Sequence, residues 1–156
     1  MKFEILLSCM NLCGEDIIER SHITSSTLIV NQCGRDDYQE YEKNGKKIRI
    51  FSVNDRGLTK SRNFAIRNSK ADICLLCDDD EVFVDNCETG IIKAYEDIPE
   101  ADVIIFDIGN RQTGQKKVPK KLNYFELMHV ASWQISFRRE SLISCLLYTS
   151  PSPRDA

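Results

Sequence analysis

The chain has 156 residues, 42% of them hydrophobic and 29% charged, with a formal net charge of −3. This composition fits one globular domain with a real core and excludes a disordered protein. No basic face dominates, so we expect no nucleic-acid partner, and no apolar run reaches the ~18 residues that a membrane span requires.

The first expected strand runs from Phe3 to Leu7 and leads into a small polar turn that includes Ser8 and Asn11. Glu4 interrupts what would be the apolar region of a signal peptide, and the run is too short for one. We therefore expect a cytoplasmic protein. Residues 15–21, which come next, have the length of one or two helical turns.

The second expected strand, Thr27 to Val30, is β-branched and apolar, as buried strands are. It ends in the polar, glycine-punctuated segment 31–37, which is typical of a ligand-binding loop. Asn44-Gly45 is a strong turn signal. A third strand, 46–51, follows it with a mixed pattern that suits a position nearer the edge of the sheet.

A helix is expected next, with Thr59 as its N-cap. Ser61 and Ala65 lie four residues apart on one face of this helix, and their small size lets the helix approach the sheet closely. Arg62 and Asn63 fall early in the helix, where they can point toward the carboxyl ends of the strands. Considered alone, that pair fits the surface of an amphipathic helix better.

The most informative stretch is an apolar strand, residues 73–77, that ends abruptly in acids. The acids are Asp78, Asp79, Asp80 and Glu81. A short apolar run predicts a buried strand of a parallel sheet, and ligands bind at the carboxyl ends of such strands. Adjacent carboxylates also repel one another. We therefore expect a divalent cation with a phosphate-bearing ligand here; the alternative is a solvated acidic turn.

The remaining elements are less informative. Residues 87–98 predict a helix that Pro99 ends, and residues 103–106 predict a fully apolar strand. The lysine-rich segment 111–123 is a long surface loop whose lysines either meet phosphates or stay solvated. Residues 133–137 alternate as a half-buried strand, after which a helix begins.

The seven cysteines form an odd, scattered set without a repeated metal-binding motif. Cys74 and Cys77 have CxxC spacing, but residues three apart on a strand point to opposite faces. We therefore expect buried or semi-buried free thiols of a reducing compartment.

The order of these elements is that of the nucleotide-binding half of a doubly wound, Rossmann-like α/β domain, a mostly parallel sheet with helices on both faces. Three segments resemble the GT-A glycosyltransferases of the family-2 type, which are inverting enzymes that use nucleotide-diphospho-sugars. Gly57 to Asn63 resembles the G-x-x-x-x-R-N helix, and residues 73–80 resemble the strand with its D-x-D motif. Residues 135–140 resemble the strand and helix start that follow the acceptor-side loop. D-x-D alone is a weak signal, but its place about fifteen residues after an R-N helix makes it more specific.

The resemblance implies metal-dependent transfer of a sugar, with inversion, from a nucleotide-diphospho-sugar (UDP-sugar being the expected donor) to a saccharide or lipid-linked acceptor. Asp80 would hold Mn²⁺ or Mg²⁺, which bridges the two phosphates and stabilises the leaving group. Asp78 would contact the ribose, or the metal through water, and Asp79 or Glu81 would support it.

The resemblance also implies a nucleoside pocket. Ser8 and Asn11 would line the base pocket, and Arg62 with Asn63 would lie near the base and pyrophosphate. The segment beginning at Asn31 departs from the family's Asp-Asp-Gly pattern. Asn31 is our candidate there, but which residue of that segment reads the base stays open.

The end of the chain departs further from the family. No acidic motif suited to a general base follows Arg139, so we expect the catalytic base to be absent from this chain. Residues 145–156 resemble a translated sequencing-adapter read-through and contain two prolines. We expect a donor-binding domain over 1–144, incomplete at its carboxyl end, and a non-native or disordered tail over 145–156.

Two alternatives stay open. One is a nucleotide-sugar-binding fragment that does not catalyse transfer. The other is an Asp/Mg-dependent phosphoryl-transfer enzyme, which usually needs an Asp nucleophile partnered by Lys or Thr at other strand ends. The segment from Ser8 to Asn11 lacks that acid.

Overall fold

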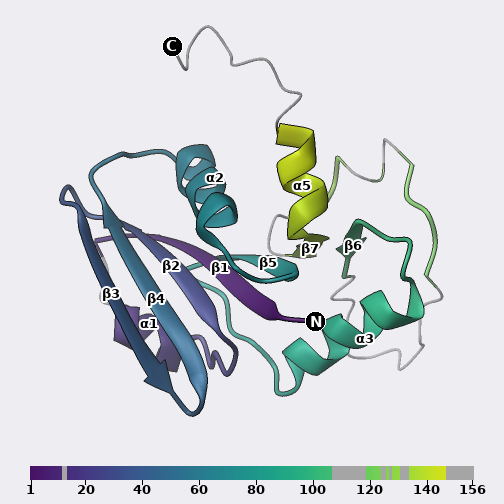
Figure 1. The fold of residues 1–156 in the computed structure, drawn as a ribbon, viewed down its shortest axis with the longest axis horizontal. Coiled ribbons are helices and arrows are strands. Elements are labelled where there is room, and N and C mark those ends of the chain that lie inside the picture. The colour runs from purple at the N-terminus through teal and green to yellow at the C-terminus, as the bar shows by residue number, and fades with distance from the viewer. Residues whose placement is uncertain (12–13, 107–118, 124–125, 127, 131–133, 147–156) are drawn as a thin grey trace, which may run out of the picture.

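In a computed structural model, the structure describes residues 1–11, 14–106, 119–123, 126, 128–130 and 134–146. The described strands form one seven-stranded sheet in the order β3-β4-β2-β1-β5-β7-β6 (Figure 1). The strands are β1 (Phe3–Met10), β2 (Thr27–Gln32), β3 (Asp37–Lys43), β4 (Lys46–Val53), β5 (Ile73–Asp78), β6 (Val103–Ile105) and β7 (Ile135–Arg138). The helices are α1 (Gly14–Arg20), α2 (Leu58–Asn68), α3 (Cys87–Asp97) and α5 (Arg139–Leu146).

The four strands β4, β2, β1 and β5 run parallel to one another at the centre of the sheet. β3 is antiparallel to β4 at one edge, and β7 is antiparallel to both β5 and β6 at the other. The expected mostly parallel α/β sheet is therefore confirmed. Because the central strands are parallel, their carboxyl ends meet along one edge of the sheet, where ligands of such folds bind.

Helices cover both faces of the sheet, with α1 and α3 on one side and α2 and α5 on the other (Figure 1). Along β1, Leu7 packs toward α1 and Leu6 toward α2, as the two-residue period of a strand requires. The same alternation separates Cys77 from Cys74, so the CxxC spacing makes no pair, as predicted. The thiols whose pairing the structure describes are free, although Cys145 is exposed rather than buried.

Two local predictions near the carboxyl edge were wrong. β1 continues to Met10, so Ser8 belongs to a strand and not to a turn. Ser8 pairs with Val30 on one side and Asp78 on the other, and two parallel neighbours satisfy its backbone better than a turn would. The N-cap of α2 is Gly57 and not Thr59. The φ angle of Gly57 is 127°, a backbone conformation that residues with a side chain rarely adopt.

One strand, β3, was not predicted from the sequence. β3 is polar and mostly exposed, and it pairs with β4 through a turn in which Asn44 and Gly45 have φ 52° and 72°. Positive φ at both central residues matches the twist of a tight hairpin. An edge strand facing water needs few apolar residues, so its composition resembles that of a loop. By contrast, the expected apolar strand at 103–106 is a short edge strand in which Val103 is 44% exposed.

The carboxyl-terminal helix α5 continues through Cys145 to Leu146, two residues past the expected boundary at 144. Residues 147–156, most of the lysine-rich segment (111–118) and Trp133 lie outside the described residues. Among the helices of the described residues, none has the length and apolar character needed to cross a membrane.

Candidate functional site

An ion pair joins two of the predicted site residues at the carboxyl edge. Arg62 projects from α2, and its Nη2 lies 3.1 Å from Oδ1 of Asp78, the last residue of β5. Both side chains are partly exposed, at 23% and 34%, so a ligand can reach them. The prediction that Arg62 points toward the acids is confirmed, and its charge offsets part of their mutual repulsion.

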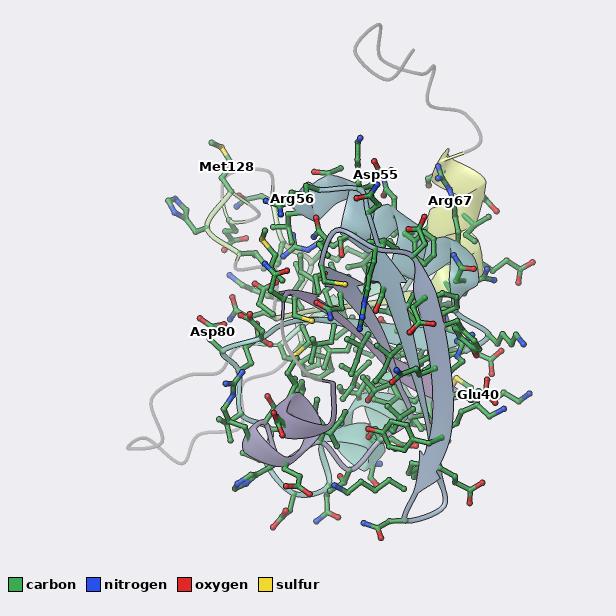
Figure 2. All side chains as sticks on the ribbon, turned by 90° about the vertical axis from the view of Figure 1, so that its left-hand side faces the viewer. Glu40, Asp55, Arg56, Arg67, Asp80 and Met128 are labelled. Carbon is green, nitrogen blue, oxygen red and sulfur yellow. The ribbon has the colours of Figure 1, made fainter. Side chains whose placement is uncertain are left out.

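The acidic turn after β5 is fixed by hydrogen bonds to backbone groups. The Asp78 N–H donates to Glu81 Oε1 (3.1 Å), and the guanidinium of Arg20, the last residue of α1, donates to the Asp79 carbonyl (3.1 Å). Asp80 is exposed at the tip of the turn (Figure 2). Burial raises the pKa of Glu81 to about 7, so near neutral pH this carboxyl is partly protonated while Asp80 faces solvent.

The chemistry of this turn suits a hard divalent cation. No group of three or more His, Cys, Asp or Glu ready to hold a metal exists among the described residues. The carboxylates that could bind a cation are those of Asp80 and of Asp78, which is also paired with Arg62. The remaining coordination positions would be filled by phosphate oxygens and water, as is common at Mg²⁺ sites. Nearby thiols do not compete, because burial raises the pKa of Cys77 and holds that of Cys9 at about 12.

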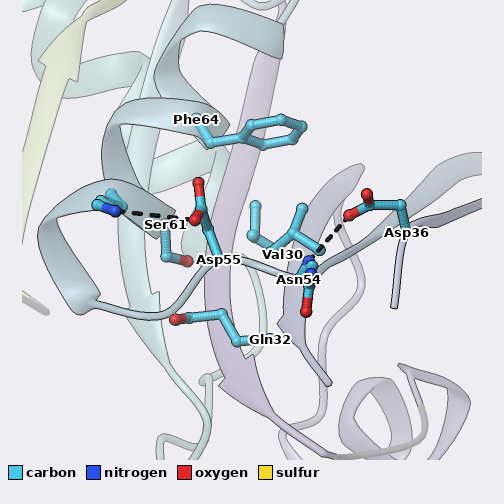
Figure 3. A pocket seen from close by; sticks show the side chains of 9 residues that line it. Val30, Gln32, Asp36, Asn54, Asp55, Ser61 and Phe64 are labelled. Carbon is cyan, nitrogen blue, oxygen red and sulfur yellow. Dashed lines mark hydrogen bonds and ion pairs between the residues drawn. The ribbon is translucent and has the colours of Figure 1, made fainter. Parts of the chain in front are cut away.

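The acids line a shallow hollow with Arg20 and Val82, and a separate cleft of about 370 Å³ opens between the ends of β2 and β4 and the first turns of α2 (Figure 3). Val30, Val53 and Phe64 supply its apolar wall. Its polar lining includes Gln32, Asp36, Asn54 and Asp55. A cleft with an apolar wall and a few polar groups is typical of small-molecule sites.

Two acceptors hold the loop that forms one side of this cleft. Gln32 Oε1 accepts the Gly57 N–H (2.6 Å), and Asp36 Oδ1 accepts the Asn54 N–H (2.9 Å). The hydroxyl of Ser61 on α2 donates to the hydroxyl of Ser8 on β1 (2.8 Å), so α2 lies close to β1. Ser61 and Ala65 are both buried, which confirms the expected close approach of the helix.

The other predicted ligand residues are more scattered. Ser8 is buried beneath Ser61, Asn11 is exposed at the end of β1 with φ 51°, and Asn63 is half-buried on α2. Asn31 lies against Cys9, whose thiol is 3.7 Å from Asn31 Oδ1, on the α1 side of the sheet. Asn31 therefore does not line the cleft beside α2.

Gln32 and Asp36 belong to the expected ligand-binding loop 31–37, although neither was singled out there, whereas Phe64 and Arg20 were not predicted as site residues. The alternation of β2 contained a usable signal: if Val30 faces α2, then Gln32 does too and Asn31 does not. Arg20 and Asp79 are 59 residues apart in the sequence, so no local sequence pattern predicts their contact.

Comparisons with known proteins agree with this arrangement. A family model described as glycosyl transferase family 2 matches residues 17–145. Among solved structures, residues 1–349 of S. aureus TarS superimpose with a TM-score of 0.63 at 15% identity, covering 99% of this chain and 53% of that one. The same protein in complex with UDP-GlcNAc gives a TM-score of 0.65 at 15% identity, covering 96% and 49%. Its complex with UDP gives 0.59 at 14% identity, covering 96% and 50%.

At this identity the TarS structures establish a shared fold. The chain spans about half the length of these structures. A search of curated proteins found no significant match.

Proposed function

Because the chain belongs to glycosyl transferase family 2, we propose that its carboxyl edge binds a nucleotide-diphospho-sugar for metal-dependent, inverting sugar transfer. The observation that carries this proposal is the Arg62–Asp78 pair beside the exposed carboxylate of Asp80. A guanidinium suited to a pyrophosphate next to carboxylate oxygens suited to a metal supports this proposal. The complexes of TarS with UDP and UDP-GlcNAc support a UDP-sugar as the donor.

We assign these residues the following roles. Arg62 orients the pyrophosphate with its planar, bidentate guanidinium. Asp78 positions Arg62 and faces the ribose, with Asp79 beside it. Asp80, with Asp78, would hold Mn²⁺ or Mg²⁺, which supplies Lewis-acid stabilisation of the leaving nucleoside diphosphate when bound.

The nucleoside would lie along the ends of β1 and β2, near Ser8, Asn11 and Asn63. The proposed acceptor is a saccharide or a lipid-linked molecule, and the proposed donor-binding domain spans residues 1–144. The proposed location is the cytoplasm.

Calorimetric titration of UDP, and separately of GDP, with and without Mn²⁺ tests the donor site. We expect metal-dependent binding that is lost in Asp80→Ala and kept in Asp85→Ala, which removes an exposed carboxylate just beyond the turn. A folded chain that binds neither nucleotide contradicts the proposal. Release of UDP from UDP-sugars then separates transfer from binding alone: metal-dependent binding without release identifies the non-catalytic alternative.

A further inference from the structure

The carboxyl end of α1 holds the acidic turn after β5 at two points. The guanidinium Nη2 of Arg20 donates to the Asp79 carbonyl (3.1 Å). The Phe83 N–H donates to the carbonyl of Ser21, the residue after Arg20 (2.9 Å). The exposed carboxylate of Asp80, the proposed metal ligand, lies in the segment between these two contacts. Two consecutive residues of α1 and its end therefore bracket Asp80.

This end of α1 is a firm support, because it is anchored in the core. Ile17 and Ile18 are only 1% and 2% exposed, and Ser21 is 1% exposed. The Ser21 N–H donates to the Ile17 carbonyl (2.9 Å). The Ile23 N–H donates to the Ile18 carbonyl (3.0 Å), and Phe83 packs against the same core cluster. The support is therefore better fixed than the exposed tip of the turn that it contacts.

The guanidinium of Arg20 binds the backbone of the turn and not an acidic side chain. The hollow that Arg20 lines is completed by Asp79, Asp80, Glu81 and Val82. Among the described residues, no ion pair joins Arg20 to these acids. Arg62, by contrast, pairs with the carboxylate of Asp78. Because Arg20 binds a carbonyl, it can hold the turn and still leave the carboxylate of Asp80 to a cation.

We propose that Arg20 is a positioning residue for the metal of the donor site: by holding the backbone at Asp79, it keeps the carboxylate of Asp80 in place before a cation binds. Clustered carboxylates repel one another, so a turn without this support would spread when no metal is bound. Hydrogen bonds that orient metal ligands commonly contribute about 10- to 100-fold to metal affinity. This inference rests on the proposed function, because it concerns how the same site holds its metal.

The positive charge of Arg20 acts against this positioning role, so the two effects have opposite signs. A guanidinium close to a metal ligand repels a cation. If only the charge of Arg20 mattered, its removal would strengthen the binding of Mn²⁺. If Arg20 holds the turn in place, its removal weakens the binding of Mn²⁺. The direction of the change therefore distinguishes a positioning residue from a nearby charge.

The test measures Mn²⁺ binding in the presence of UDP to the full chain, Arg20→Gln and Arg20→Met, with the electron paramagnetic resonance signal of free Mn²⁺ as the readout. Both replacements are neutral and too short to reach the Asp79 carbonyl. We expect each to raise the half-saturating Mn²⁺ concentration about 10-fold. Glu19→Gln, which breaks an exposed ion pair with Lys43 on the same helix, is the control and should change this concentration less than about 2-fold.

Amide hydrogen exchange of the metal-free proteins gives a second readout. We expect faster exchange at the Phe83 N–H in both Arg20 variants, while the amides of β1 stay protected. Thermal unfolding completes the comparison. A role of Arg20 in overall stability alone would lower the unfolding midpoint and leave the half-saturating Mn²⁺ concentration unchanged.

The outcomes separate this inference from the proposed function. If the folded, unmodified chain binds no UDP with Mn²⁺, the donor site is wrong, and the role of Arg20 falls with it. If that chain binds UDP with Mn²⁺ but the Arg20 variants need the same concentration of Mn²⁺ or less, the donor site stands and the positioning role is overturned. An unprotected Phe83 N–H in the unmodified, metal-free chain would also overturn the support from α1, and this measurement needs no variant.

Discussion

The carboxylate of Glu4 and the guanidinium of Arg49 meet at 2.7 Å inside the protein, where their side chains are only 7% and 5% exposed. The pair links β1 to β4 across β2. Arg49 also donates to the Asn68 carbonyl at the end of α2, and Ser69 donates to the second oxygen of Glu4. This network holds the carboxyl end of α2, while Gln32 holds its amino end at Gly57.

Breaking the buried pair should destabilise the fold. Arg49→Met leaves the carboxylate of Glu4 buried without its cation, which typically costs about 3–5 kcal/mol of unfolding free energy. Urea denaturation measures the change. Lys47→Met, which removes the exposed pair of Lys47 with Glu40, is the control and should cost under about 1 kcal/mol. Equal losses in the two variants would contradict the argument.

Removing the cation of the candidate site should weaken nucleotide binding. Arg62→Ala deletes the guanidinium next to Asp78, and losing a charge-assisted hydrogen bond of about 1.5–3 kcal/mol corresponds to roughly 10- to 100-fold lower affinity for UDP with Mn²⁺. Arg67→Ala, which truncates an exposed arginine on the same helix, should leave the affinity unchanged. The role of Arg62 is refuted if both variants bind UDP alike.

The pKa of Glu81 predicts a pH-dependent stability. Burial raises this pKa from 4.5 in the unfolded chain to about 7 in the folded one. Between these values the unfolded state gives up the proton more readily, so the contribution of Glu81 to stability is full below pH 4.5 and is lost as pH rises through about 7. Glu81→Gln should remove this loss. Urea unfolding of the unmodified chain and of Glu81→Gln, with a chelator present and at several pH values between about 4.5 and 7, measures this difference. If the unfolding free energies of the two proteins changed with pH in the same way, the prediction would be wrong.

The contact of Ser61 with Ser8 predicts a steric limit at the helix–sheet junction. Ser61→Leu forces a larger side chain into a buried contact and should cost about 1–3 kcal/mol of stability. It should also displace the turn that carries Arg62 and lower the affinity for UDP. Ser61→Ala removes one hydrogen bond, worth about 1 kcal/mol, and should leave binding nearly intact. Matching affinities for the two variants would show that the spacing does not matter.

Much of the architecture is readable from the sequence because it depends on local chemistry. The apolar runs at 27–30 and 73–77 become buried strands, since a strand covered on both faces must be apolar throughout. The acids that end β5 fall at the carboxyl edge, because a strand must leave the core before charges can follow. Arg62 reaches Asp78 for a similar reason: the first turns of a helix that follows a parallel strand lie at that same edge.

The tertiary structure alone decided which neighbours each residue meets. β3 is a strand because β4 pairs with it, although its own composition is that of a loop. Gly57, and not Thr59, begins α2 because Gln32, 25 residues earlier, accepts its N–H. Likewise, Gln32 and not Asn31 lines the cleft, since the register of β2 sets which side chains face α2. Composition fixes what a segment can bury, whereas pairing across the chain fixes where each side chain points, and the candidate site depends on both.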